Sequence, residues 1–264
     1  MSDAASGAAT GSLAFTVDGR SIYCATQGAG EEAFVLVPGY GADHTGWIMT
    51  QPALAARGRV FAPDLPGGLM SSLDVGPGDI AFFAGIVRAL MDNAGLARVH
   101  LVGHSMGAAT AVAVATAVPE RVSRLTLIAP AGIDRWINMA FISGFPLIAT
   151  EAEARPFMEM LVASPRMISP EMLRLVAAYT TTPGVRPALE TIAAATFPGE
   201  QVYLYKDRLG ALGMPVSVIW GADDQIVRPV VDGFPEGVPV TVIPKAGHLV
   251  HLEQAPEVNR LILS

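Results

Sequence analysis

One short segment places a serine between two glycines. Residues 103–107 read Gly-His-Ser-Met-Gly, after the β-branched run Val99–Val102 and before small residues that favour a helix. A serine on a sharp strand-to-helix turn needs glycines beside it, because a Cβ at Gly103 or Gly107 would crowd the backbone. The turn also places Ser105 at a helix N-terminus, where unpaired N–H groups favour developing negative charge. This context predicts that Ser105 is a nucleophile.

A serine hydroxyl is barely ionised at neutral pH, so it needs a base to take its proton during attack. His248 is the predicted base, because Gly247 frees the loop to present it where parallel strands end. His251 is expected to be its neighbour, and His44 lies in an early loop from which it could touch a substrate. The two other histidines are expected to pack in or near a strand: His100 and His104.

The base in turn needs a carboxylate that fixes its tautomer and stabilises the imidazolium. The run Val216–Trp220 leads into Gly-Ala-Asp-Asp, which puts two acids just past a strand end. Asp224 is the predicted partner of the histidine, and Asp223 is expected to shape the turn. Asp134, which follows the preceding strand, is the alternative acid.

Attack on a carbonyl builds an oxyanion that needs preorganised donors. The first predicted donor is the backbone N–H of Met106, directly after the nucleophile. The second is the N–H of Tyr40 in the glycine-rich segment Val37–Gly41, which follows a strand. Glycines on both sides of Tyr40 allow its backbone to approach a substrate closely.

The elements that must position these groups alternate along the chain. Short antiparallel strands are expected first, at Leu13–Val17 and Ser21–Thr26, and a helix over Asp79–Asn93 has apolar residues at helical spacing. The later β-branched runs are typical of buried parallel strands: Ala33–Val37, Val60–Ala62, Val99–Val102, Leu125–Ile128, Val216–Ile219 and Val240–Ile243. Strands that alternate with helices predict a mostly parallel, doubly wound α/β sheet.

Strand texture disappears over residues 133–212, which are rich in Met, Ala and Leu. We expect this segment to be a helical cap inserted into an α/β core of residues 13–132 and 213–264. Residues 1–12 are expected to be a disordered leader. Most large apolar side chains of the cap should form its own small core, and four are predicted to line a substrate pocket: Met139, Phe141, Ile142 and Phe145.

Composition excludes several classes of function. The net charge of −7 over 264 residues offers a nucleic-acid backbone no basic surface. The longest small-apolar stretch, Ala108–Val118, is too short to cross a bilayer, and the leader lacks the pattern of a secretory signal.

Cys24 is the only cysteine, which fits a reducing, cytoplasmic location. No metal-ligand spacing or dinucleotide fingerprint is found, so no metal and no cofactor are predicted. The oligomeric state is left open, a homo-oligomer included.

Four motifs together resemble the capped α/β-hydrolase family: GHSMG at 103–107, DLPG at 64–67, GADDQIV at 221–227 and GHLVHLE at 247–253. The resemblance spans nearly the whole chain after the leader and implies the fold and a Ser, Asp, His triad in that chain order. Two positions depart from the family pattern, because Pro38 and Gly68 stand where histidines are usual. More narrowly, the chain is similar to the hydrolase-like domain of acetoin-dehydrogenase-associated dihydrolipoamide acetyltransferases.

The sequence therefore predicts a cofactor-independent serine hydrolase that cleaves a small, mainly apolar ester or related acyl compound through an acyl-enzyme. An acyltransferase or a C–C bond hydrolase could use the same residues, because the pocket selects the acceptor. A catalytically silent binding protein with this fold is the alternative from another class.

Overall fold

A central sheet of eight strands organises the chain. The structure is a computed structural model, and it describes residues 10–264. The strand order is β1-β2-β4-β3-β5-β6-β7-β8, in which β1 and β2 are antiparallel additions to a parallel sheet. The strand bounds are β1 Thr10–Val17, β2 Arg20–Gln27, β3 Ala33–Val37, β4 Arg59–Pro63, β5 Val99–His104, β6 Val122–Ile128, β7 Val216–Gly221 and β8 Val240–Ile243. This arrangement confirms the predicted fold class.

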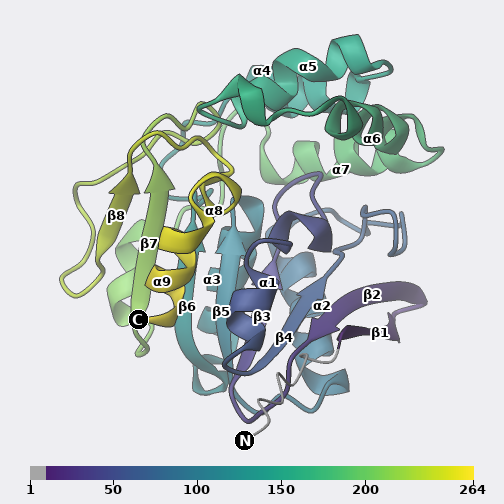
Figure 1. Ribbon diagram of the computed structural model, residues 1–264. Helices are drawn as coiled ribbons and strands as arrows, with labels where there is room; N and C mark the ends of the chain where they lie inside the picture. The colour runs from purple at the N-terminus through teal and green to yellow at the C-terminus, as the bar shows by residue number, and fades with distance from the viewer. Residues whose placement is uncertain (1–9) are drawn as a thin grey trace, which may run out of the picture.

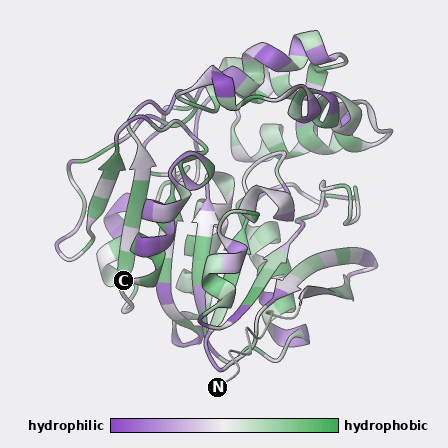
Figure 2. Cartoon of the chain, viewed as in Figure 1, coloured by the Kyte–Doolittle hydropathy of each residue, from purple (hydrophilic) through white to green (hydrophobic). Residues whose placement is uncertain are grey.

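The middle of the sheet is the centre of the core. Every residue of β3 and β5 is buried, and the two strands pair in parallel from Phe34 with His100 to Val37 with Gly103. Strands covered on both faces consist of continuous apolar residues, which is why these runs do not alternate with polar ones. Figure 2 shows the same concentration of hydrophobic residues along the central strands.

Helices cover both faces of the sheet (Figure 1). Helix α2 (Ile80–Asn93) packs on α3 (Met106–Ala117), and α1 (Gln51–Ala55) packs on α9 (Ala255–Leu263), which follows the short α8 (Val250–Glu253). The predicted start of α2 is confirmed, since the Asp79 side chain accepts a hydrogen bond from Phe82 N at 2.8 Å. None of the described helices is long and apolar enough to cross a membrane.

The chain between β6 and β7 forms a layer of helices above the carboxyl ends of the parallel strands (Figure 1). We refer to this layer as the cap; its helices are α4 Met139–Gly144, α5 Glu151–Met160, α6 Pro170–Thr181 and α7 Val185–Thr196. The connections to the sheet are held by the buried Gln201, which accepts from Gly132 N and donates to Trp136 O, both at 2.6 Å. One amide therefore ties the outgoing connection to the returning one.

The first strand begins earlier than the sequence predicts. Thr10–Ser12 belong to β1 and pair with the end of β2, from Thr10 opposite Gln27 onwards. The expected disorder of residues 10–12 is therefore wrong, and the expectation for residues 1–9 lies outside the described residues. Backbone hydrogen bonds extend this ladder irrespective of side-chain polarity, so a polar, small-residue sequence did not reveal it.

Candidate active site

Ser105 lies at the turn between β5 and α3, as its motif predicts. Its backbone has φ 54° and ψ −120°, on the left-handed side of conformational space that a residue with a Cβ rarely occupies. A Cβ on Gly103 would approach Gly107 O to 2.4 Å, and one on Gly107 would approach Val37 O to 2.2 Å. The two glycines therefore allow β5, α3 and the end of β3 to meet tightly around the serine.

His248 and Asp224 form a buried pair. Their Nδ1 and Oδ2 atoms are 2.8 Å apart, and the side chains are 4% and 0% exposed. The other oxygen of Asp224 accepts from the N–H groups of Ile226 and Val227 at 2.8 and 3.0 Å, which fixes the carboxylate. Asp134 instead accepts from Trp136 N, two residues along the chain. The geometry thus pairs the histidine with the acid that the motif register indicates.

Two more histidines and Asp223 lie near this pair, whereas the buried His100 packs in β5 as expected, with Nε2 2.9 Å from Thr126 Oγ1. The His104 ring lies between those of His248 and His251, at centroid distances of 4.7 and 4.5 Å, and its Nε2–H donates to His248 O at 3.0 Å. Burial lowers the pKa of His104 well below its usual value and that of His251 to about 3, so both rings are neutral. Asp223 N donates to Ala246 O, which joins the two loops.

The loop after β3 rests directly on the nucleophile turn. A Cβ on Gly39 would lie 3.1 Å from the Cβ of Ser105. Within the described chain, the N–H groups of Tyr40 and Met106 donate to no protein acceptor. The predicted oxyanion donors must likewise be free of other acceptors in the protein, and their role stays a prediction.

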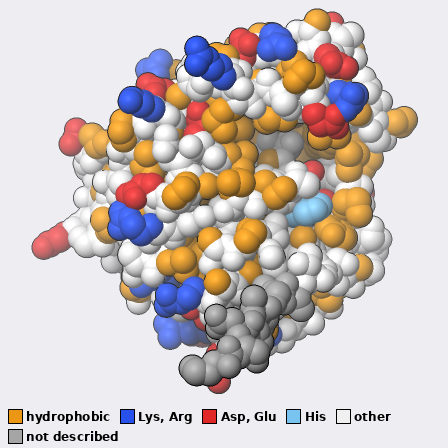
Figure 3. Space-filling model, in the orientation of Figure 1, with side chains coloured by type: hydrophobic (Ala, Val, Ile, Leu, Met, Phe, Trp, Pro, Cys, Tyr) orange, Lys and Arg blue, Asp and Glu red, His pale blue; other side chains and the backbone are white. Residues whose placement is uncertain are grey.

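Three of the four side chains predicted to line a pocket gather over this loop. Phe141 and Phe145 stack with centroids 5.3 Å apart, and the Phe145 ring would collide with a Cβ on Gly41. Ile142 follows Phe141 in α4 and is buried, whereas Met139 begins that helix and is half-buried. Figure 3 shows a hollow below the cap with hydrophobic side chains around it.

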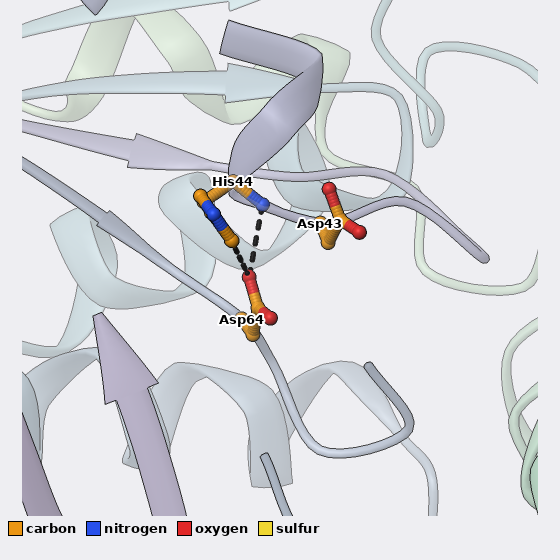
Figure 4. A group of neighbouring side chains, drawn as sticks. All are labelled: Asp43, His44 and Asp64. Atoms are coloured by element: carbon orange, nitrogen blue, oxygen red, sulfur yellow. Dashed lines mark hydrogen bonds and ion pairs between the residues drawn. The ribbon is translucent and has the colours of Figure 1, made fainter. Parts of the chain in front are cut away.

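A second histidine and aspartate pair lies at the end of β4 (Figure 4). Asp64 is fully buried and accepts from both the backbone N and Nδ1 of His44, at 2.9 and 2.7 Å. This hydrogen bond raises the pKa of His44. With Asp43, these residues bring three potential metal-ligand atoms within 4.8 Å of one another. His44 pairs with Oδ1 of Asp64 only, and among the described residues the buried Oδ2 of Asp64 has no hydrogen-bond partner. Sequence reasoning missed Asp64, although its place in the DLPG motif past a strand was a signal.

Glu253 is another residue that sequence reasoning missed. Its carboxylate accepts from Gly247 N at 2.5 Å and from Ala163 N at 2.9 Å. It thereby joins the loop that carries His248 to the segment that follows α5 in the cap. Its place at the end of the GHLVHLE motif was a signal, but its Ala163 partner is 90 residues away and carries no local pattern.

The fold and this arrangement of residues define the class of protein. The sequence matches the α/β hydrolase fold family over residues 32–255, so the chain belongs to that family. It is 37% identical over 238 residues to the dihydrolipoyllysine-residue acetyltransferase component of the acetoin cleaving system of Pseudomonas putida. The match covers 90% of this chain but only 64% of that relative. These matches confirm the resemblance to the α/β-hydrolase family and the narrower similarity to the acetoin-associated acetyltransferases, both inferred from the motifs.

Hydrolases are also among the proteins that the chain resembles. It is 28% identical to a 2-hydroxy-6-oxononadienedioate/2-hydroxy-6-oxononatrienedioate hydrolase of Cupriavidus pinatubonensis, over 92% of this chain and 89% of the relative. The crystal structure of a 2-hydroxy-6-oxo-6-phenylhexa-2,4-dienoate hydrolase from a Rhodococcus species superimposes with a TM-score of 0.85. That structure is 23% identical and covers 97% of this chain and 98% of its own, which shows the shared fold.

Proposed function

We propose that this protein is a serine hydrolase that cleaves a small, mainly apolar ester through an acyl-enzyme. The observation that carries the proposal is the buried His248 and Asp224 pair, 2.8 Å apart, on a loop whose carbonyl is bonded to the residue preceding Ser105. An imidazole held in this way keeps Nδ1 protonated and leaves Nε2 as the base.

The residues divide the reaction between them. Ser105 Oγ attacks the carbonyl carbon while its proton passes to His248 Nε2, and Asp224 stabilises the imidazolium that forms. The N–H groups of Tyr40 and Met106 donate to the oxyanion. Collapse of the tetrahedral intermediate breaks the bond to the leaving alcohol, which takes the proton from Nε2. Water then repeats the sequence on the acyl-enzyme, releasing the acid and free Ser105.

The cap supports the choice of substrate. The side chains of Phe141 and Ile142 in α4 and of Phe145, which directly follows it, are aromatic or aliphatic, and all three are buried. An apolar acyl group placed there would lose water on binding, which favours its transfer from solution. We therefore propose that Met139, Phe141 and Ile142 of α4, with Phe145 directly after it, form the apolar wall of the acyl site.

Hydrolysis of p-nitrophenyl esters of increasing acyl length tests the proposal. We expect turnover by the wild type, an optimum at short or medium chains, and loss of turnover in Ser105→Ala. A fluorophosphonate probe should label Ser105 in the wild type and leave the variant unlabelled. Folded wild-type protein that neither turns over esters nor reacts with the probe would contradict the proposal and favour a binding role.

A second candidate is cleavage of a carbon–carbon bond next to a ketone, or transfer of the acyl group to an acceptor other than water. The named activities of the relatives favour keeping both, since one is a component of an acetyltransferase system and another a hydrolase of an oxo-dienedioate. Product analysis with and without an added thiol separates them. A product ratio that does not respond to the thiol excludes transfer, and acid release from a vinylogous 1,5-diketone would establish C–C cleavage.

A further inference from the structure

The side chain of Tyr40 leaves its loop and enters the cap. Its hydroxyl donates to Leu189 O in α7 at 3.1 Å and lies 3.5 Å from Ile142 O in α4. The residue is 8% exposed, so these contacts are shielded from water. A buried phenol that donates to a main-chain carbonyl is held more firmly than an exposed one, because water cannot replace its partner.

Aromatic contacts hold the same ring on two sides. The ring of Tyr40 packs on those of Phe145 and Phe197, at centroid distances of 6.3 and 6.2 Å. Phe145 directly follows α4, and Phe197 directly follows α7. Residue 40 is thus enclosed by the ends of two cap helices.

The backbone of the same loop touches the nucleophile turn. A Cβ on Gly39 would come within 3.1 Å of Ser105, and a Cβ on Gly107 would come within 2.4 Å of Pro38 O. The loop therefore lies between two surfaces, the turn that carries Ser105 and the cap. With the Tyr40 ring held by cap contacts on two sides and at its hydroxyl, the cap restrains the position of the residue and of its backbone N–H.

We infer that Tyr40 is a positioning residue through which the cap holds the oxyanion donor in place, so that the oxyanion site is complete only when α7 is seated. This inference rests on the proposed function and adds a control of catalysis by the cap. The Tyr40 hydroxyl does not touch the reacting atoms; it acts through its own backbone N–H.

The chain supplies a matched control in Tyr179. Its hydroxyl, in α6, donates to Gly67 O at 3.0 Å, so it is a half-buried tyrosine that also joins cap and core. Its acceptor lies in the loop after β4 and not in the segment Val37–Gly41 that carries the predicted oxyanion donor. Tyr179→Phe therefore removes a similar hydrogen bond without releasing the oxyanion donor.

Kinetics of p-nitrophenyl acetate hydrolysis and inhibition by a trifluoromethyl ketone test the inference. Active enzyme is first counted by fluorophosphonate titration, which removes any effect of partial unfolding. We expect Tyr40→Phe to lower kcat about three- to tenfold with KM unchanged, the factor that one hydrogen bond carries. Affinity for the ketone, whose tetrahedral adduct carries an oxyanion, should fall by the same factor. Tyr179→Phe should change neither quantity.

Tyr40→Leu, which also removes the ring contacts, should lower both quantities further and keeps the test informative if one variant folds poorly. Equal kcat and equal ketone affinity in wild type and Tyr40→Phe, with Ser105 still labelled in both, would overturn the inference and leave the proposed function intact. A wild type whose Ser105 does not react with the fluorophosphonate would overturn both.

Discussion

Asp224→Asn separates the role of the carboxylate from its place in the fold. One oxygen of Asp224 accepts from Ile226 N and Val227 N, and the other faces His248 Nδ1 at 2.8 Å. An asparagine can keep both backbone bonds with its own oxygen, which leaves its NH₂ group facing Nδ1. The imidazole must then accept at Nδ1 and carry its proton on Nε2, which cannot take a proton from Ser105.

The expected result is a loss of kcat of about 10³- to 10⁴-fold, or about 4 to 5.5 kcal/mol in the activation barrier, with little loss of stability. The assay is steady-state hydrolysis of a p-nitrophenyl ester, with urea unfolding of the same preparations. Asp223→Asn is the matched control, because Asp223 is exposed and only its backbone N–H joins the neighbouring loop. Activity of a folded Asp224→Asn within about tenfold of the wild type would refute the assigned pair.

Three further predictions concern folding. Gly107→Ala should lower the free energy of unfolding by more than about 3 kcal/mol, because the new Cβ would meet a backbone oxygen at 2.2 Å. Gly85→Ala, whose Cβ would have nothing within 4 Å, should raise it by about 0.5 to 1 kcal/mol. Urea unfolding of the two variants and the wild type checks both values. His44→Gln should lower the free energy of unfolding most below about pH 6.5 and progressively less above it. The pKa of His44 is raised in the folded state, so the stability that its charged form contributes is lost as the pH rises and His44 deprotonates. Urea unfolding at acid and alkaline pH measures this, and an equal loss of free energy at both would contradict it. Gln201→Met should lower the free energy of unfolding by about 1 to 3 kcal/mol, because the buried N–H of Gly132 and the half-buried carbonyl of Trp136 lose their partner. A smaller effect in urea unfolding would mean that water replaces the amide.

Local signals in the sequence were sufficient for the parallel core. The run Ala33–Val37 coincides with β3, because buried parallel strands have continuous β-branched and apolar residues between turns. The run Val240–Ile243 coincides with β8 at the edge of the sheet, where only Ile243 is buried. The start of α2 was equally clear from the capping Asp79. The start of β1 was not, because its outer ladder is held by backbone hydrogen bonds that polar residues make equally well.

The sequence likewise predicts some residues of the candidate site and not others. Ser105, Asp224 and His248 each stand in a short motif with its own turn chemistry, so sequence reasoning could select them one at a time. The contacts between cap and core could not be predicted, because residues such as Tyr40 and Leu189 are 149 positions apart and carry no local pattern. The triad and the donors remain predictions until the variants are assayed.

The strained backbone of Ser105 affects how this position is expected to evolve once catalysis is lost. A residue with a Cβ at φ 54° and ψ −120° holds about 1 to 3 kcal/mol of strain, which glycine would relieve. A gene copy no longer selected for catalysis would therefore gain thermal stability when glycine replaces the serine, but not when another residue with a Cβ does. Inactive descendants should drift toward glycine at this position, and a glycine there would mark a lost activity more reliably than a change at the histidine.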